Sequence, residues 1–146
     1  MFSNIVVGTD GSETAAAAVA LAADLAREHG AVLHVVNAYS VPSAGMAVVQ
    51  AGTMAVADPG VSGEVLRGAS EKLLAEATGA IEGTKIESHA RVGSAADVVI
   101  SLAEEVGADL IVVGSKGMRG ARRVIGSVPN RIAHRGPCHV LIAKTA

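Results

Sequence analysis

The stretch Leu110–Gly117, with the sequence LIVVGSKG, decides the fold of this chain. Its first four residues are continuously apolar, and such short runs rich in Val and Ile are typical of strands buried on both faces of a parallel sheet. Glycines directly after a strand let the backbone approach a ligand without a Cβ in the way. The stretch therefore predicts a buried parallel strand whose carboxyl end carries a ligand-binding turn.

Four more strands are predicted around this one. Three are apolar runs, and the fourth alternates polar and apolar residues as an edge strand with one wet face does; they are Ile5–Val7, Val32–Val36, Val140–Ala143 and, as the edge strand, Lys85–Val92. Helical periodicity with capping residues fills the gaps between the strands. The helical patterns run from Ser12 to Gly30, Ser62 to Ile81, Ser94 to Gly107 and Ser127 to Arg135.

Alternating strands and helices predict an α/β fold, a doubly wound parallel five-stranded sheet with helices on both faces. The strand order 3-2-1-4-5 would place a switch point between the first and fourth strands, where ligands bind at the carboxyl ends. Those ends read Gly8–Ser12 (GTDGS) and Gly114–Gly117 (GSKG). We expect one domain over residues 1–146, with 39–60 as a long flexible loop that is a lid, a partner surface or a mobile excursion.

The amino-acid composition narrows the classes of molecule that this chain is expected to bind. Aromatic residues make up 1% of the chain, which leaves little for stacking nucleic-acid bases, and no apolar run is long enough to span a membrane. Residues 110–146 carry seven basic and no acidic residues, whereas 1–109 carry five basic and fourteen acidic ones. This asymmetry indicates an anionic small ligand or, alternatively, a solvated basic helix face. One cysteine and no basic leader predict the cytoplasm.

The basic block lies inside a candidate phosphate loop. Gly114-Ser115-Lys116-Gly117 leaves one strand, and Gly126-Ser127 opens the last helix, with Lys116, Arg119, Arg122 and Arg123 within this span. Backbone N–H groups, a helix N-terminus and cations together favour phosphate. The alternative is that the glycines only form a strand-to-helix turn.

These motifs resemble the universal stress protein family of the ATP-binding type, whose signature is G-x2-G, nine residues, then G-[S/T]. Here eight residues separate Gly117 from Gly126-Ser127, one fewer than in the signature. The flanks Ile5–Ser12, Ala108–Gly114 and Pro137–Ile142 also match the family. The resemblance covers Asn4 to Lys144 and implies a Rossmann-like domain that dimerises through its last strand.

The resemblance also implies a nucleotide site. Asp10 would lie near the adenine or ribose, although an Asx-turn is the alternative role, and the backbone at Asn37-Ala38 would meet the adenine edge. The full set of expected nucleotide-binding residues is Thr9, Asp10, Gly11, Ser12, Asn37, Ala38, Gly114, Ser115, Gly117, Met118, Arg119, Gly126, Ser127, Val128 and Pro129. The expected ligand is ATP or another adenine nucleotide such as cyclic AMP, with Mg²⁺ as an accompanying ion.

Catalysis and metal binding by side chains have little support in the sequence. The histidines His29, His34, His89, His134 and His139 show no zinc-ligand spacing, and the serines have no evident base partner. We therefore expect a regulatory nucleotide-binding protein of the stress response, a homodimer through residues 140–144. The alternatives are a slow ATP hydrolase and a dimeric interaction module that binds no nucleotide.

Overall fold

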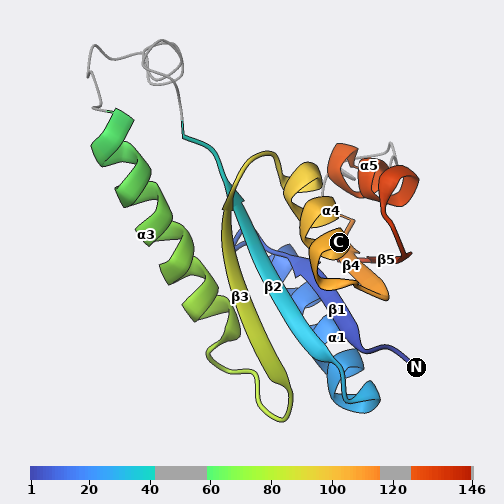
Figure 1. Cartoon of the computed structure of the whole chain (residues 1–146). Coiled ribbons are helices and arrows are strands. Elements are labelled where there is room, and N and C mark those ends of the chain that lie inside the picture. The colour runs from blue at the N-terminus through green and yellow to red at the C-terminus, as the bar shows by residue number, and fades with distance from the viewer. Residues whose placement is uncertain (42–58, 116–125, 146) are drawn as a thin grey trace.

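The computed structural model describes residues 1–41, 59–115 and 126–145 (Figure 1). Strands and helices alternate along the chain: β1 (Asn4–Gly8), α1 (Glu13–His29), β2 (Val32–Tyr39), α3 (Pro59–Thr78), β3 (Lys85–Val92), α4 (Ala95–Val106), β4 (Leu110–Gly114), α5 (Ser127–Arg135) and β5 (His139–Ala143). The predicted alternation is therefore confirmed.

The five strands form one sheet in the order β3-β2-β1-β4-β5. All four pairings are parallel, with β1 between β2 and β4, so the predicted order and switch point are confirmed. β3 is an edge strand with no fully buried residue, in agreement with its alternating sequence. The carboxyl ends of β1 and β4 therefore lie side by side, and the chain leaves them toward α1 and α5, respectively.

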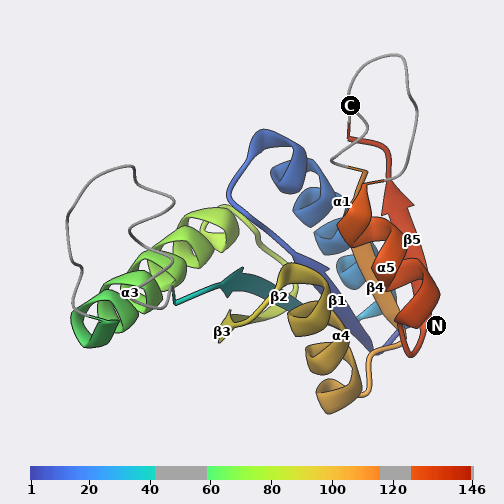
Figure 2. The ribbon, with the colours of Figure 1, turned by 90° about the horizontal axis from the view of Figure 1, so that it is seen from above.

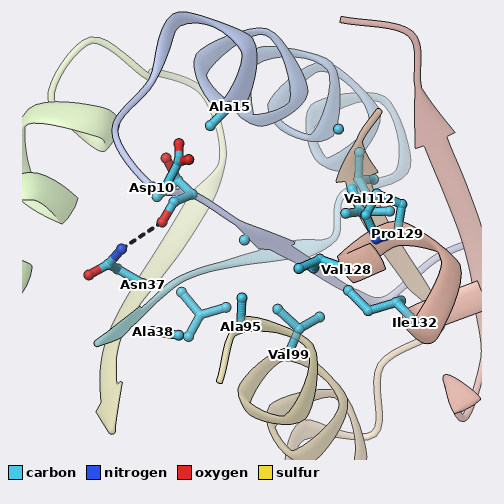
Figure 3. Close-up of a pocket in the computed structure, with 15 residues that line it drawn as sticks. Asp10, Ala15, Asn37, Ala38, Ala95, Val99, Val112, Val128, Pro129 and Ile132 are labelled. Carbon is cyan, nitrogen blue, oxygen red and sulfur yellow. Dashed lines mark hydrogen bonds between the residues drawn. The ribbon is translucent and has the colours of Figure 1, made fainter. Parts of the chain in front are cut away.

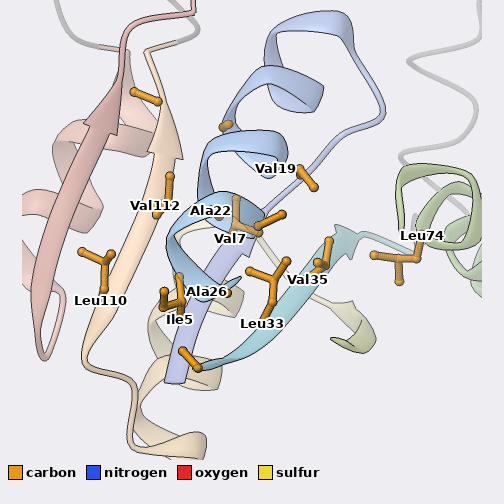
Figure 4. Close-up of a cluster of buried hydrophobic side chains, with 14 residues drawn as sticks. Ile5, Val7, Val19, Ala22, Ala26, Leu33, Val35, Leu74, Leu110 and Val112 are labelled. Carbon is orange, nitrogen blue, oxygen red and sulfur yellow. The ribbon is translucent and has the colours of Figure 1, made fainter. Parts of the chain in front are cut away.

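Each face of the sheet has its own hydrophobic core, as the layers in Figure 2 show. α1 and Leu74 of α3 cover one face, and Figure 4 shows Ile5, Val7 and Leu33 packed beneath them. α4 and α5 cover the other face, over Val6, Val36 and Ile111. Val6 and Val7 are completely buried on opposite faces because successive residues of a strand alternate sides. The apolar runs in the sequence reflect this two-sided burial.

Capping residues set the ends of α1 and α4 where the sequence predicts them. Ser12 is the N-cap of α1, and its side chain accepts a hydrogen bond from the Ala15 N–H. Gly30 and Gly107 end α1 and α4 in the left-handed conformation, with φ of 67° and 62°. Ser94 is the N-cap of α4, but its hydroxyl donates to Asp97 and makes no cap hydrogen bond.

Three sequence expectations need correction. α3 runs over Pro59–Thr78, three residues earlier than the predicted Ser62–Ile81, because Pro and Gly are tolerated in a first helical turn. β2 extends to Tyr39, since β3 keeps pairing with it after β1 has ended. The link between β2 and α3 is consequently 40–58, shorter than the predicted 39–60 loop, and its residues 42–58 lie outside the described part of the chain. Among the described residues, no helix is long and apolar enough to cross a membrane.

Candidate functional site

A cavity of about 190 Å³ opens at the carboxyl ends of β1, β2 and β4 (Figure 3). Its walls are mainly aliphatic and come from both turns that the sequence singles out, together with the first residues of α4 and α5. The lining residues are Gly8, Thr9, Asp10, Ala15, Val36, Asn37, Ala38, Ala95, Val99, Val112, Val113, Gly114, Val128, Pro129 and Ile132. The cavity therefore lies at the switch point of the sheet, where an open α/β fold binds its ligands.

The turn after β1 is held by its own side chains. Thr9 Oγ1 accepts a hydrogen bond from the Gly11 N–H at 3.1 Å, and Asp10 Oδ1 accepts one from the Ser12 N–H at 3.0 Å. Gly11 has a φ of 80°, and a Cβ there would approach Leu73 to 3.0 Å. The Asx-turn that the sequence leaves open for Asp10 is thus present, and it fixes one Asp10 oxygen at the rim of the cavity.

The Asn37 side chain links β2 to the turn after β1 and to α3. Its Nδ2 donates to the Thr9 carbonyl at 2.7 Å, and its Oδ1 accepts from the Ser70 hydroxyl of α3 at 2.6 Å. All three residues are buried, so these hydrogen bonds satisfy polar groups that water does not reach. The Asn37 side chain therefore ties β2 to the turn after β1 and to α3, a role that its place in the sequence does not reveal.

The backbone of Ala38 faces the cavity. The Val36 carbonyl accepts a hydrogen bond from the Thr9 N–H at 2.9 Å, so Val36 directs its peptide groups toward β1. Peptide groups alternate sides along a strand, so Ala38, two residues on, directs its N–H and carbonyl to the same side. β1 ends at Gly8, opposite Val36, and its register does not extend to Ala38. Ala38 thereby presents a donor and an acceptor at the cavity wall.

The opposite wall comes from α4 and α5. Gly8 permits close approach of α4, because a Cβ there would lie 3.2 Å from Val99. Gly126, rather than Ser127, is the N-cap of α5, so Ser127 is the first helical residue and makes no side-chain cap. Val128 and Pro129 of the first turn then line the cavity. The N-terminus of α5, with its positive dipole end, is thus directed toward the site.

The structure gathers about half of the expected nucleotide-binding residues around the cavity. Those that line it are Thr9, Asp10, Asn37, Ala38, Gly114, Val128 and Pro129. Gly11, Ser12, Gly126 and Ser127 belong to the two adjoining turns without lining it. Ser115 is buried, and its hydroxyl accepts from the Thr145 N–H at 3.1 Å, so it joins β4 to the end of β5. Gly117, Met118 and Arg119 lie outside the described residues.

Several lining residues were not foreseen from the sequence. Ala15, Ala95 and Val99 are small or aliphatic helix residues whose pattern indicates only a buried face. The one signal for Ala95 is its position directly after the predicted cap Ser94. Because β3 feeds α4 across the face of the sheet, the first turn of α4 arrives beside the end of β1.

An ion pair joins the two helices that form one wall of the cavity. Arg131 of α5 lies 3.1 Å from Asp97 of α4, and this ion pair joins the two helices without lining the cavity. The four basic residues of the candidate loop, Lys116, Arg119, Arg122 and Arg123, lie outside the described residues. Any contribution of these four to the site rests on the sequence alone.

Comparisons with known proteins place the chain in a family. The model of the universal stress protein family matches residues 1–144. A universal stress protein of Mycobacterium tuberculosis H37Rv is 33% identical over 148 residues, covering 99% of this chain and 97% of that protein. A putative universal stress protein of Staphylococcus haemolyticus is 31% identical, covering 99% and 86%.

Solved structures agree. A universal stress protein in complex with cAMP has a TM-score of 0.71 and 34% identity over 99% of this chain and 98% of its own. A protein from the universal stress protein family of Burkholderia pseudomallei has a TM-score of 0.74 and 26% identity over 99% and 96%. With matching sequence and fold, the chain belongs to the universal stress protein family.

Proposed function

We propose that this chain binds an adenine nucleotide in the switch-point cavity and acts as a regulatory protein of the stress response. The observation that carries the proposal is a mainly aliphatic cavity lined by Ala38 just beyond the end of β1, where strand alternation directs the Ala38 N–H and carbonyl to the β1 side. Adenine offers a complementary acceptor at N1 and donor at N6, together with an apolar ring face. The relative solved with cAMP supports the same ligand class.

The remaining parts of a nucleotide follow from the direction of the cavity. With the base against Ala38, the ribose lies by Asp10, whose carboxylate can accept a hydrogen bond from a ribose hydroxyl. The phosphates then extend past Gly114 toward the N-terminus of α5, where peptide N–H groups and the helix dipole favour negative charge. The four basic residues of the candidate loop lie in the sequence between Gly114 and the start of α5. Mg²⁺ would accompany a polyphosphate ligand.

We propose binding without efficient turnover, with ATP and cyclic AMP as the two candidate ligands. The described lining is aliphatic apart from Thr9, Asp10 and Asn37, and the Asn37 side chain is occupied by Thr9 and Ser70. Hydrolysis needs a group that orients an attacking water in line with the phosphate. Asp10 at the ribose end is poorly placed for that task, so slow ATP hydrolysis is the second candidate function.

The test uses a substitution that fills the cavity without touching the core. Ala95 is exposed at the start of α4 and lines the cavity, so Ala95→Trp should occupy the base slot (Figure 3). Ser101→Trp, exposed on the same helix away from the cavity, is the matched control. Calorimetry with ATP and with cyclic AMP should show at least a tenfold loss of affinity, ~1.4 kcal/mol, in Ala95→Trp alone.

Equal affinity in both variants would remove the cavity from the binding site. Nucleotide identified by mass spectrometry after denaturing freshly purified protein distinguishes ATP from cyclic AMP. Absence of binding by either ligand would favour the third possibility, an interaction module that acts through protein contacts.

We also propose a homodimer through β5. This strand pairs only with β4 among the described strands, and Leu141 on it is 37% exposed. An apolar edge presents unpaired peptide groups, and a two-fold antiparallel pairing would satisfy both copies. The described cysteine content, a single Cys138, suits the reducing cytoplasm, and the scarcity of aromatic residues disfavours single-stranded nucleic acid as a partner.

A further inference from the structure

Two histidines and a glutamate converge on the sheet away from the switch-point cavity. His34 comes from β2, and Glu87 and His89 come from the edge strand β3. His34 Nδ1 lies 3.1 Å from His89 Nε2 and 3.5 Å from Glu87 Oε2. The candidate ligand atoms of the three side chains all lie within 4.8 Å of one another. Because 55 residues separate the two histidines, local spacing in the sequence gives no sign of the cluster.

A hydrogen bond that His34 donates to Asn4 on the neighbouring strand β1 fixes the tautomer of His34. Its Nε2 lies 3.2 Å from Oδ1 of Asn4 on β1. An amide oxygen only accepts, so Nε2 carries the proton and Nδ1 presents a lone pair. That lone pair faces the Glu87 carboxylate and His89 Nε2. Three electron-rich atoms therefore lie together, and the only proton among them is the one that His89 Nε2 can carry. This is the arrangement that a cation stabilises.

Burial disfavours the charged form of both imidazoles. Burial is the largest cause that lowers the pKa of His34 and of His89. Lys85 lowers the pKa of His34 further, against the opposing charge of Glu87. His34 and Arg91 lower the pKa of His89 further, against Glu87 and Glu105. Neutral imidazole is the form that binds metals. Glu105, which also faces His89, is held by Arg91 at 2.7 Å and 3.1 Å.

We propose that His34 Nδ1, His89 Nε2 and the Glu87 carboxylate bind a divalent transition-metal ion of the zinc class, with a fourth position open to solvent. A tetrahedral ion with bonds of about 2.1 Å holds its ligand atoms about 3.4 Å apart. The two separations from His34 Nδ1, 3.1 Å and 3.5 Å, are close to this spacing, and all three ligand atoms lie within 4.8 Å of one another. Two imidazoles and one carboxylate suit zinc rather than magnesium or calcium, which prefer oxygen ligands.

The burial of the three side chains gives the site an inner and an outer part. The His34 side chain is 4% exposed and the Glu87 side chain is 43% exposed, so the ion enters from the Glu87 side. Lys85 lies 3.5 Å from the other Glu87 oxygen, Oε1, and leaves Oε2 toward His34. The ion would bridge β2 to the edge strand β3, and it requires no residue of the nucleotide cavity.

The experiment uses the full chain without an affinity tag, dialysed against buffered Zn²⁺ and analysed for bound metal. We expect one Zn²⁺ per chain at micromolar free concentration and a rise in Tm. His89→Gln should weaken binding at least tenfold, and His134→Gln, an exposed histidine of α5 outside the cluster, should leave it unchanged. Asn4→Ala removes the tautomer-fixing acceptor and should cost about 10–100-fold in affinity.

Two further variants make the result decisive. Glu87 is partly exposed on the edge strand β3, so Glu87→Gln tests the site even if His89→Gln fails to fold. Cys138→Ser removes the one thiol of the chain, and we expect it to retain Zn²⁺. Replacement of Zn²⁺ by Co²⁺ should give visible absorption bands of four-coordinate cobalt that disappear in Glu87→Gln. The proposal is overturned by absent stoichiometric binding, by equal affinity in Glu87→Gln, or by binding that depends on Cys138 instead.

Discussion

Asn37 Nδ2 donates a hydrogen bond to the Thr9 carbonyl at 2.7 Å, across the point where β1 has ended and β2 continues. The Thr9 carbonyl thus accepts its hydrogen bond from a side chain of β2 and not from a backbone N–H of that strand. We infer that the N–H of the neighbouring Ala38 is thereby left to face the cavity. The Asn37 side-chain amide therefore ends the hydrogen bonding between β1 and β2 at the edge of the cavity. Ser70 of α3 completes the arrangement by donating to the Asn37 Oδ1.

Replacing Asn37 should disturb both stability and binding. Asn37→Ala leaves the buried Thr9 carbonyl and Ser70 hydroxyl without this partner, at a cost of about 1–3 kcal/mol in the free energy of unfolding. Urea unfolding measures the loss, and calorimetry should show weaker nucleotide binding. Asn130→Ala, at an exposed position of α5, should change stability by less than about 0.5 kcal/mol. A fully stable Asn37→Ala protein would contradict the structural role.

Salt should weaken ATP binding more than cyclic AMP binding. ATP carries several negative charges and cyclic AMP carries one, while Lys116, Arg119, Arg122 and Arg123 belong to the candidate phosphate loop. Screening lengths shrink from about 10 Å at 0.1 M to about 3 Å at 1 M salt, so the ligand with more charge loses more affinity. Titrations of both ligands across this range provide the measurement. Identical slopes would show that these cations do not face the phosphates.

The β5 edge should control the oligomeric state. Leu141→Lys places a charge on the strand that we propose to pair with its copy, so the protein should shift from dimer to monomer. Leu21→Lys is a matched control, because Leu21 on α1 is also 37% exposed. Light scattering at high micromolar concentration distinguishes the two species. A wild-type monomer, or a Leu141→Lys dimer, would contradict the proposed pairing, and nucleotide affinity should remain intact in both variants.

Asp109 should contribute stability that disappears in acid. Its Oδ2 accepts from the Ser3 N–H at 2.6 Å and the Asn4 N–H at 2.9 Å, and these backbone hydrogen bonds, with that of Asn4 the larger cause, lower the pKa of the carboxyl. A lowered folded pKa means that the unfolded chain takes up the proton first. The contribution is therefore complete above the unfolded value of about 3.9 and is lost as the pH falls through the folded pKa.

The comparison of Asp109→Asn with the wild type tests this sign. The variant should be less stable at neutral pH, and the difference should shrink as the pH falls below the unfolded pKa of Asp109. Urea unfolding over a pH series measures both curves. A difference that persists unchanged into strong acid would mean that the charge of Asp109 is not what stabilises the start of β1.

Sequence alone determined the framework of this protein. Buried strands of a parallel sheet must be apolar on both faces, so Ile5–Val7 and Leu110–Val113 could be recognised without any partner. Local capping also fixed the ends of α1, because Ser12 and Gly30 act on peptide groups a few residues away. Handed crossovers then left few strand orders, and the observed order is the predicted one.

Tertiary structure alone decided which side chains meet. Asn37 binds Thr9, and His34 meets His89, through strand register, which depends on packing over the whole sheet and not on local spacing. The entry of Ala95 into the cavity depends on how α4 crosses the sheet, and an alanine carries no sequence signal of that role. The helices and strands could thus be predicted because they depend on short-range hydrogen bonds and on burial. The sites could not, because they depend on contacts between distant residues that strand register and packing set.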